Sequence, residues 1–265
     1  MIKPFALRTG DTIGIFTPSS PGYVQNFGLF ENGIKNLEKM GFKVKLGTVT
    51  KERKSQGYRS ATPRERASEM MDLIEDPEVK GLVATIGGMN SSSLIPFLNF
   101  ERIKETRKVI CGFSDITSLH LSIAKYSGLR TFYGPTVMCW FGDWPDGILE
   151  STDSFLQAVV LHQSGIRQFE VPKRSSNHHR RWDNDDWKTI TREWNENEGW
   201  RTLSAGRVVA EVVPAGLNTL MSSCGTDYFP DLKGRILLFE DMDAPQSRTE
   251  RSLLNLPRFG GHVFQ

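Results

Sequence analysis

Strand-like and helix-like segments alternate along the first part of the chain, and this alternation limits the fold more than any other feature of the sequence. Short apolar runs occur in "DTIGIF", "FKVKLG", "VKGLVATIGG" and "KVICGFS". Longer segments with helical periodicity separate them, such as "ATPRERASEMMDLIEDP", which Thr62 opens with Pro63 at its first position. The pattern predicts an α/β fold with a doubly wound parallel sheet over residues 1–165.

Three polar or glycine-rich loops directly follow predicted strands. "TPSS" follows the first strand, "IGGMNS" the third and "GFSD" the fourth. Because ligands bind beyond the carboxyl ends of parallel strands, these loops should share one rim of the sheet. The sequence therefore predicts a functional site at this rim.

The stretch "VICGFSDIT", residues 109–117, contains the most specific candidate at the rim. Its apolar run indicates the end of a strand, and "DITSLHLSIAKYSG" indicates an amphipathic helix closed by Gly128. Ser114 would then lie on a strand-to-helix turn beside backbone N–H groups, the geometry of a nucleophile elbow. A helix N-cap formed by Ser114 or Asp115 explains the same residues. The local sequence leaves both interpretations open.

Charge and cysteine content narrow the expected ligands and location. With 33 basic and 31 acidic residues the net charge is +2, which favours a small molecule or peptide over nucleic acid or a membrane surface. The N-terminus lacks the apolar core of a signal peptide, and no apolar run reaches the about 20 residues that span a bilayer. Cys111, Cys139 and Cys224 are far apart, so neither a disulfide framework nor a zinc site is predicted. A cytoplasmic protein without a metal or cofactor is expected, and a homodimer is compatible with it.

The character of the chain changes after the predicted sheet. Residues 166–204 are polar and contain Trp182, Trp187, Trp194 and Trp200. They form either a solvated linker or an insert that offers aromatic faces to a planar ligand. Beyond them, "GRVVAEVVPAGLNTL" and "GRILLFEDMD" alternate like strands and predict a shorter β-rich C-terminal unit over residues 205–265.

With "TIGGMNSSSLIPFL", "GFSDIT", "TFYGP", "GLNTL" and "ILLFEDMD" in this order, the chain resembles the LD-carboxypeptidase family of serine peptidases. Within the family it is most similar to the branch that confers self-immunity to microcin C. The resemblance covers nearly the whole chain and implies a flavodoxin-like sheet of the class I glutamine amidotransferase type, followed by an incomplete C-terminal domain. It implies hydrolysis of a peptide or amide bond near a free carboxylate.

The resemblance also implies roles for individual residues. Ser114 corresponds to the nucleophile, and Glu240 corresponds to the carboxylate that orients the catalytic histidine. The backbone N–H groups of Gly88 and Asp115 correspond to the oxyanion hole, where bare glycine backbone can approach a developing oxyanion. A surface charge at the end of a strand remains the alternative interpretation of Glu240.

Substrate contacts are expected from Asn90 and from the polar insert. Asn90 would either bind a substrate carboxylate or close a turn. Trp182, Trp187 and Trp194 would stack on an aryl or nucleotide group, which favours a peptidyl-nucleotide over a muropeptide.

The sequence departs from the family pattern in two places. The family's base is a histidine on a loop beyond the glutamate, and none of the five histidines, His120, His162, His178, His179 and His262, stands at that position. Pro214, Ala215 and Gly216 replace the usual two glycines and asparagine. We therefore expect that the carboxyl-terminal part of the domain is absent and that the chain as written has little peptidase activity.

Three alternatives stay open beside an enzyme of the microcin C immunity type. The first is a muropeptide LD-carboxypeptidase, and the second is an inactive remnant that binds peptide-like ligands. The third is a flavodoxin-like nucleotide-binding domain, but "TIGG" alone, without a longer glycine-rich phosphate motif, supports it weakly.

Overall fold

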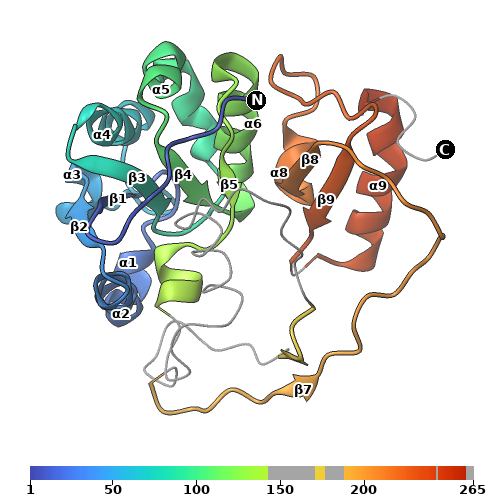
Figure 1. Ribbon diagram of the computed structural model, residues 1–265, viewed down its shortest axis with the longest axis horizontal. Coiled ribbons are helices and arrows are strands. Elements are labelled where there is room, and N and C mark those ends of the chain that lie inside the picture. The colour runs from blue at the N-terminus through green and yellow to red at the C-terminus, as the bar shows by residue number, and fades with distance from the viewer. Residues whose placement is uncertain (143–170, 177–187, 243, 261–265) are drawn as a thin grey trace.

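The N-terminal part of the protein is a doubly wound α/β unit (Figure 1). The computed structural model describes residues 1–142, 171–176, 188–242 and 244–260. Five parallel strands form the sheet in the order β2-β1-β3-β4-β5, which confirms the predicted architecture. Their bounds are β1 Thr12–Phe16, β2 Lys43–Leu46, β3 Val79–Ala84, β4 Val109–Gly112 and β5 Phe132–Tyr133.

The strand order reverses next to β1, and this reversal fixes where a ligand can bind. The chain passes from β1 to β2 on one side and then returns to β3 on the other side of β1. In such sheets the crevice lies beyond the carboxyl ends of the two strands at the reversal. The loops after β1 and β3, residues 17–21 and 85–90, therefore border the expected site.

Helices cover both faces of the sheet and bury two separate cores. One core joins the sheet to α1 (Gly22–Gln25), α2 (Phe27–Lys39) and the π-helical turn η3 (Val137–Phe141). The other core joins it to α4, η1, α5 and α6. These elements span α4 Pro63–Glu75, η1 Ser91–Phe97, α5 Phe100–Thr106 and α6 Thr117–Ser127, and α3 (Thr48–Lys51) follows β2.

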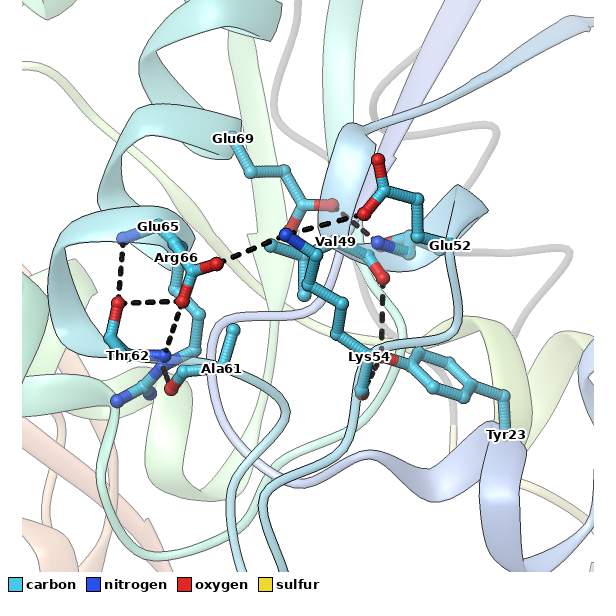
Figure 2. A network of polar contacts seen from close by, with 10 residues as sticks. Tyr23, Val49, Glu52, Lys54, Ala61, Thr62, Glu65, Arg66 and Glu69 are labelled. Carbon is cyan, nitrogen blue, oxygen red and sulfur yellow. Dashed lines mark hydrogen bonds and ion pairs between the residues drawn. The ribbon is translucent and has the colours of Figure 1, made fainter.

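The start of α4 follows from its sequence. Thr62 accepts a hydrogen bond from the backbone of Glu65, whose side chain accepts one from the Thr62 backbone, and Pro63 lies at the first helical position. Figure 2 shows this capping box, with Lys54 between Glu65 and Glu52. The pKa of Glu65 is lowered to about 2, and the hydrogen bond from the Thr62 hydroxyl makes the largest contribution to this shift.

Two helical regions are divided into shorter helices. α1 and α2 are separate because Asn26, between them, adopts an extended conformation and accepts a hydrogen bond from Leu29 N–H. The segment after "IGGMN" is divided into the 3₁₀ helix η1, which contains Pro96, and α5, which Asn99 caps.

The described part of the insert contains a short antiparallel pair. β6 (Arg174–Ser175) pairs with β7 (Asn195–Glu196). The C-terminal unit contains the parallel strands β8 (Val212–Gly216) and β9 (Ile236–Glu240) with the helices α8 (Leu217–Ser222) and α9 (Gln246–Gly260). Strand-like alternation did not predict these helices.

The C-terminal unit packs on the first unit through a third core. Its members are Leu121 of α6, Leu232 of the loop before β9, and residues of β8, α8 and α9, namely Val213, Ala215, Leu217, Leu220 and Leu256. Among the described residues, no helix is both long and apolar enough to cross a bilayer.

Candidate active site

Ser114 lies on a strained turn at the carboxyl end of β4. It is the first residue of the 3₁₀ turn η2 (Ser114–Ile116) and has a φ of 60°, in the left-handed region. For a residue other than glycine this conformation costs about 1–2 kcal/mol, and such outliers gather at functional sites. The backbone N–H of Ser114 donates a 2.9 Å hydrogen bond to Tyr133 Oη. The geometry is that of a nucleophile elbow rather than of a simple N-cap, since no side-chain cap bond starts this turn.

Two consecutive glycines lie against this turn. A Cβ on Gly87 would be 3.2 Å from Ser114 Oγ and 3.4 Å from Asp115 N, so a side chain there would press on the turn. Gly88 has a φ of 151°, and a Cβ on it would be 2.2 Å from Ser19 Oγ. Sequence reasoning selected Gly88, and the structure adds Gly87, where an added Cβ would meet Ser114.

The carboxylate of Asp115 connects three loops of the rim. Asp115 is 4% exposed, and its Oδ2 accepts hydrogen bonds from Ser19 Oγ at 2.6 Å, Asn90 N at 2.9 Å and Ser91 N at 2.8 Å. Its backbone carbonyl accepts a further bond from Ser91 Oγ at 2.6 Å. The side chain is therefore an anchor of the rim, while its backbone N–H has no acceptor among the described residues.

A buried cation, Arg66, holds the same rim from the side of α4. It is fully buried, and its guanidinium donates to Asn90 Oδ1 at 2.6 Å and Ser93 Oγ at 3.0 Å. It also donates to the carbonyls of Ala61 and Pro18. Burial lowers the pKa of Arg66. Sequence reasoning missed this residue, because nothing in "PRERASEMM" distinguishes it from a solvated helix charge.

Asn90 is fixed by these two charged groups. Its N–H donates to the Asp115 carboxylate, and its carbonyl and side-chain oxygens accept from Arg66. Its Nδ2 is buried and has no acceptor within the described ranges. A buried donor without a partner costs free energy, which makes this amide a candidate ligand contact.

Glu240, at the end of β9, reaches the Ser114 turn from the C-terminal unit. Its Oε1 accepts a 2.7 Å hydrogen bond from Tyr133 Oη, and its Oε2 accepts one of 3.2 Å from Met242 N. A second path runs through Thr117, whose Oγ1 donates to Ser114 O at 2.6 Å and accepts from Gly216 N at 2.9 Å. The structure thus brings together Ser114 and Glu240, with Tyr133 as an intermediate that sequence reasoning missed.

His120 is the one histidine among the described residues, and both of its ring nitrogens make hydrogen bonds. Nε2 lies 2.8 Å from Gly112 O and Nδ1 lies 2.8 Å from Thr131 Oγ1. The carbonyl requires an N–H, so Nε2 donates and Nδ1 accepts. Burial lowers the pKa of His120 to about 4. This side chain stabilises the end of β4 and offers no free nitrogen to Ser114. His162, His178, His179 and His262 lie outside the described residues.

One of the three candidate tryptophans of the insert lies in the described part. Trp194 is half-buried, with the guanidinium carbons of Arg174 and Arg192 at 4.8 Å and 5.6 Å from its rings. Trp182 and Trp187 lie outside the described residues. Over the described ranges, no group of three His, Cys, Asp or Glu side chains could hold a metal ion.

A doubly wound sheet that holds a strained serine at its carboxyl rim, with a carboxylate reaching the same turn, is the arrangement expected of a serine hydrolase. More specifically, the chain belongs to the LD-carboxypeptidase family. The model of the family's N-terminal domain matches residues 13–134, and the model of its C-terminal domain matches residues 209–262. The protein is therefore a serine-type peptidase by descent.

Two known relatives and one solved structure illustrate the relationship. The "Putative carboxypeptidase" of Vibrio cholerae is 35% identical over 98% of this chain and 76% of its own length. The microcin C7 self-immunity protein MccF of Escherichia coli is 35% identical over 95% of this chain and 73% of its own length. The solved structure of MccF in complex with aspartyl sulfamoyl adenosine superimposes with a TM-score of 0.87 at 34% identity, over 97% of this chain and 76% of that one.

Proposed function

We propose that this member of the family is an amidase of the microcin C immunity type, which cleaves a bond between an aminoacyl carbonyl and a nitrogen in an aminoacyl or peptidyl nucleotide. The observation that carries the proposal is the hydrogen-bonded path from the strained Ser114 through Tyr133 to Glu240. It holds a serine on an elbow near a carboxylate from the other domain, the two groups between which a catalytic triad places its base.

In the proposed reaction, Ser114 Oγ attacks the carbonyl carbon while a general base takes its proton. The tetrahedral intermediate collapses, the leaving nitrogen takes that proton, and an acyl-serine ester remains. Water then attacks the ester with the same base and releases the free acid. The base is a histidine by family resemblance, oriented by Glu240. It comes from outside the described residues, because both nitrogens of His120 are engaged.

Two backbone groups suit the developing oxyanion. The N–H of Asp115 has no acceptor among the described residues and lies beside the Ser114 turn. The N–H of Gly88 follows Gly87, where an added Cβ would lie 3.2 Å from Ser114 Oγ. Donors fixed before the reaction stabilise an oxyanion without reorganisation, so we assign both N–H groups to the oxyanion hole.

Substrate recognition is assigned to Asn90 and the tryptophan-rich insert. The free Nδ2 of Asn90 supplies the donor that a substrate carboxylate needs. Trp194, with Arg174 and Arg192 against its rings, combines an aromatic surface with positive charge, which suits a base and its phosphate. Trp182 and Trp187 are assigned to the same surface. The MccF complex with aspartyl sulfamoyl adenosine supports a nucleotide-bearing substrate.

The proposal includes an arrangement of parts and a location. Residues 1–165 supply the nucleophile, residues 166–204 select the substrate and residues 205–265 supply Glu240. We place the enzyme in the cytoplasm, and a homodimer is compatible with the proposal. Light scattering of the purified chain tests the oligomeric state directly.

Release of D-alanine from a muropeptide is the second candidate, and the family's name favours it. One experiment separates the two: the protein and its Ser114→Ala variant are incubated with aspartyl sulfamoyl adenosine and, separately, with an LD-tetrapeptide. We expect slow aspartate release, because none of the five histidines stands at the family position of the base, and we expect it to disappear in the variant. D-alanine release alone would establish the second candidate, and ligand binding without either product would identify a protein that binds but does not cleave.

A further inference from the structure

Tyr133 lies where the two domains meet at the candidate site. It ends β5, the edge strand of the sheet, and pairs with Gly112 of β4. Its ring packs edge-on against Phe113 at 6.4 Å and lies 5.9 Å from the ring of His120. The phenol is therefore held by the strand that carries Ser114, and its direction is set before any contact with the C-terminal unit.

The hydroxyl of Tyr133 accepts one hydrogen bond and donates another. It accepts the backbone N–H of Ser114 at 2.9 Å and donates to Glu240 Oε1 at 2.7 Å. Burial and the neighbouring Glu240 raise the pKa of Tyr133, so the phenol keeps its proton and remains a donor. Because a neutral hydroxyl has one proton, donation to Glu240 leaves the oxygen lone pairs for Ser114 N–H.

Gly216 provides the space for this contact. A Cβ on Gly216 would lie 2.9 Å from Glu240 Oε1 and 3.3 Å from Tyr133 Oη. Its φ of -70° is accessible to any residue, so the glycine is required by the neighbouring oxygens and not by the backbone conformation.

We propose that Tyr133 is a positioning residue for the proposed hydrolysis, on which this inference rests. Its hydroxyl fixes Glu240 Oε1 and the Ser114 turn in one frame, so that Oε2 is presented to the base. Tyr133 itself does not touch the reacting atoms. It acts through Glu240, and its contribution should vanish when that carboxylate is removed.

The test is a double-mutant cycle of Tyr133→Phe and Glu240→Ala, measured both in urea unfolding and in hydrolysis of aspartyl sulfamoyl adenosine. Tyr23→Phe with Glu240→Ala is the matched control. Tyr23 is also a buried phenol, but its hydroxyl donates to Lys54 O at 2.6 Å in a separate network, shown in Figure 2. We expect the Tyr23 pair to be additive and the Tyr133 pair to be non-additive in unfolding.

In hydrolysis, Tyr133→Phe should lower kcat about ten- to a hundredfold, the range for losing a hydrogen bond to a charged group, with KM unchanged. In the Glu240→Ala background it should cost nothing further. Equal losses in both backgrounds, or an additive unfolding cycle, would overturn the inference. If the unmodified chain hydrolyses nothing, the proposed function fails, and the unfolding cycle still decides whether Tyr133 and Glu240 are coupled.

Gly216→Ala gives an independent check that leaves both hydroxyl and carboxylate in place. The added methyl should separate Glu240 from Tyr133 and reproduce the kcat loss of Tyr133→Phe. Gly206→Ala is the control, since a Cβ there would meet nothing within 4 Å. Equal kcat values for the two alanine variants would contradict the role assigned to this contact.

Discussion

Ser19 Oγ donates a 2.6 Å hydrogen bond to Asp115 Oδ2 across 96 positions of sequence. The bond ties the loop after β1 to the turn that carries Ser114. Asp115 therefore has two separate parts at the site: a carboxylate that anchors the rim, and a backbone N–H that we propose for the oxyanion hole. The role of the carboxylate as an anchor is enough to explain why an aspartate follows the serine in "GFSD".

Asp115→Ala should destabilise the protein by about 2 kcal/mol or more. The substitution removes the acceptor oxygen of the N–H groups of Asn90 and Ser91, which would be left buried without a partner. Urea unfolding measures the change, and Asp72→Ala on the exposed side of α4 is the control. If the two variants are equally stable, the carboxylate is not the anchor described above.

Ser114→Gly should be more stable than Ser114→Ala by about 1 kcal/mol. Both variants lose the hydroxyl, but only glycine adopts the φ of 60° without steric cost. Thermal or urea unfolding of the two inactive variants provides the comparison. An alanine variant that matches or exceeds the glycine variant would show that the turn relaxes and stores no strain.

Gly87→Ala should lower kcat/KM by less than the about hundredfold loss expected when a reacting atom is displaced by about an ångström. Its Cβ would lie 3.2 Å from Ser114 Oγ, so the hydroxyl would have to shift by a few tenths of an ångström. Gly206→Ala is again the control for glycine replacement. Full activity in Gly87→Ala would mean that Ser114 approaches its substrate from another side.

The free energy of unfolding should fall as the pH falls from 6.5 to about 4, in part because of His120. Its pKa is lowered by burial from 6.5 to about 4, so in this range the unfolded chain binds a proton that the folded chain does not. The contribution is complete above pH 6.5, and about 3 kcal/mol of it is lost by pH 4.

His120→Gln tests this titration, because the amide can still donate to Gly112 O but does not ionise in this range. Urea unfolding of both proteins at the two ends of the range should give a smaller difference for the variant. Equal differences would assign the pH dependence to other groups, such as the carboxylates.

The sequence patterns predicted the helix ends and turns that depend on residues close together in the chain. Thr62 and Pro63 started α4 as expected, and Gly128 closes α6 in the left-handed conformation that favours glycine. The strand-to-helix turn at Ser114 was visible because an apolar run gave way to helical periodicity within a few residues. The break between α1 and α2 at Asn26 carries no such local signal, because a cap inside a continuous helical pattern resembles an ordinary polar position.

Contacts between distant segments were not predictable in this way. Arg66 reaches the loops of Pro18 and Asn90, which meet only in the folded sheet. Tyr133 and Glu240 are 107 positions apart, and neither carries a local signal of the other. The strand-like alternation of "ILLFEDMD" predicted β9 correctly but contained no information on helix α9, whose apolar side is set by packing against α8.

The bond between Tyr133 and Glu240 also has a consequence for synthesis of the protein in the cell. Domains generally fold in order as the chain leaves the ribosome. The sheet, the Ser114 turn and Tyr133 all precede the C-terminal unit, so the rim can form while Glu240 is still being translated. Glu240, which we propose orients the base, is the last of these groups to be translated. A nascent chain can therefore hold a folded Ser114 turn before the proposed catalytic carboxylate is present.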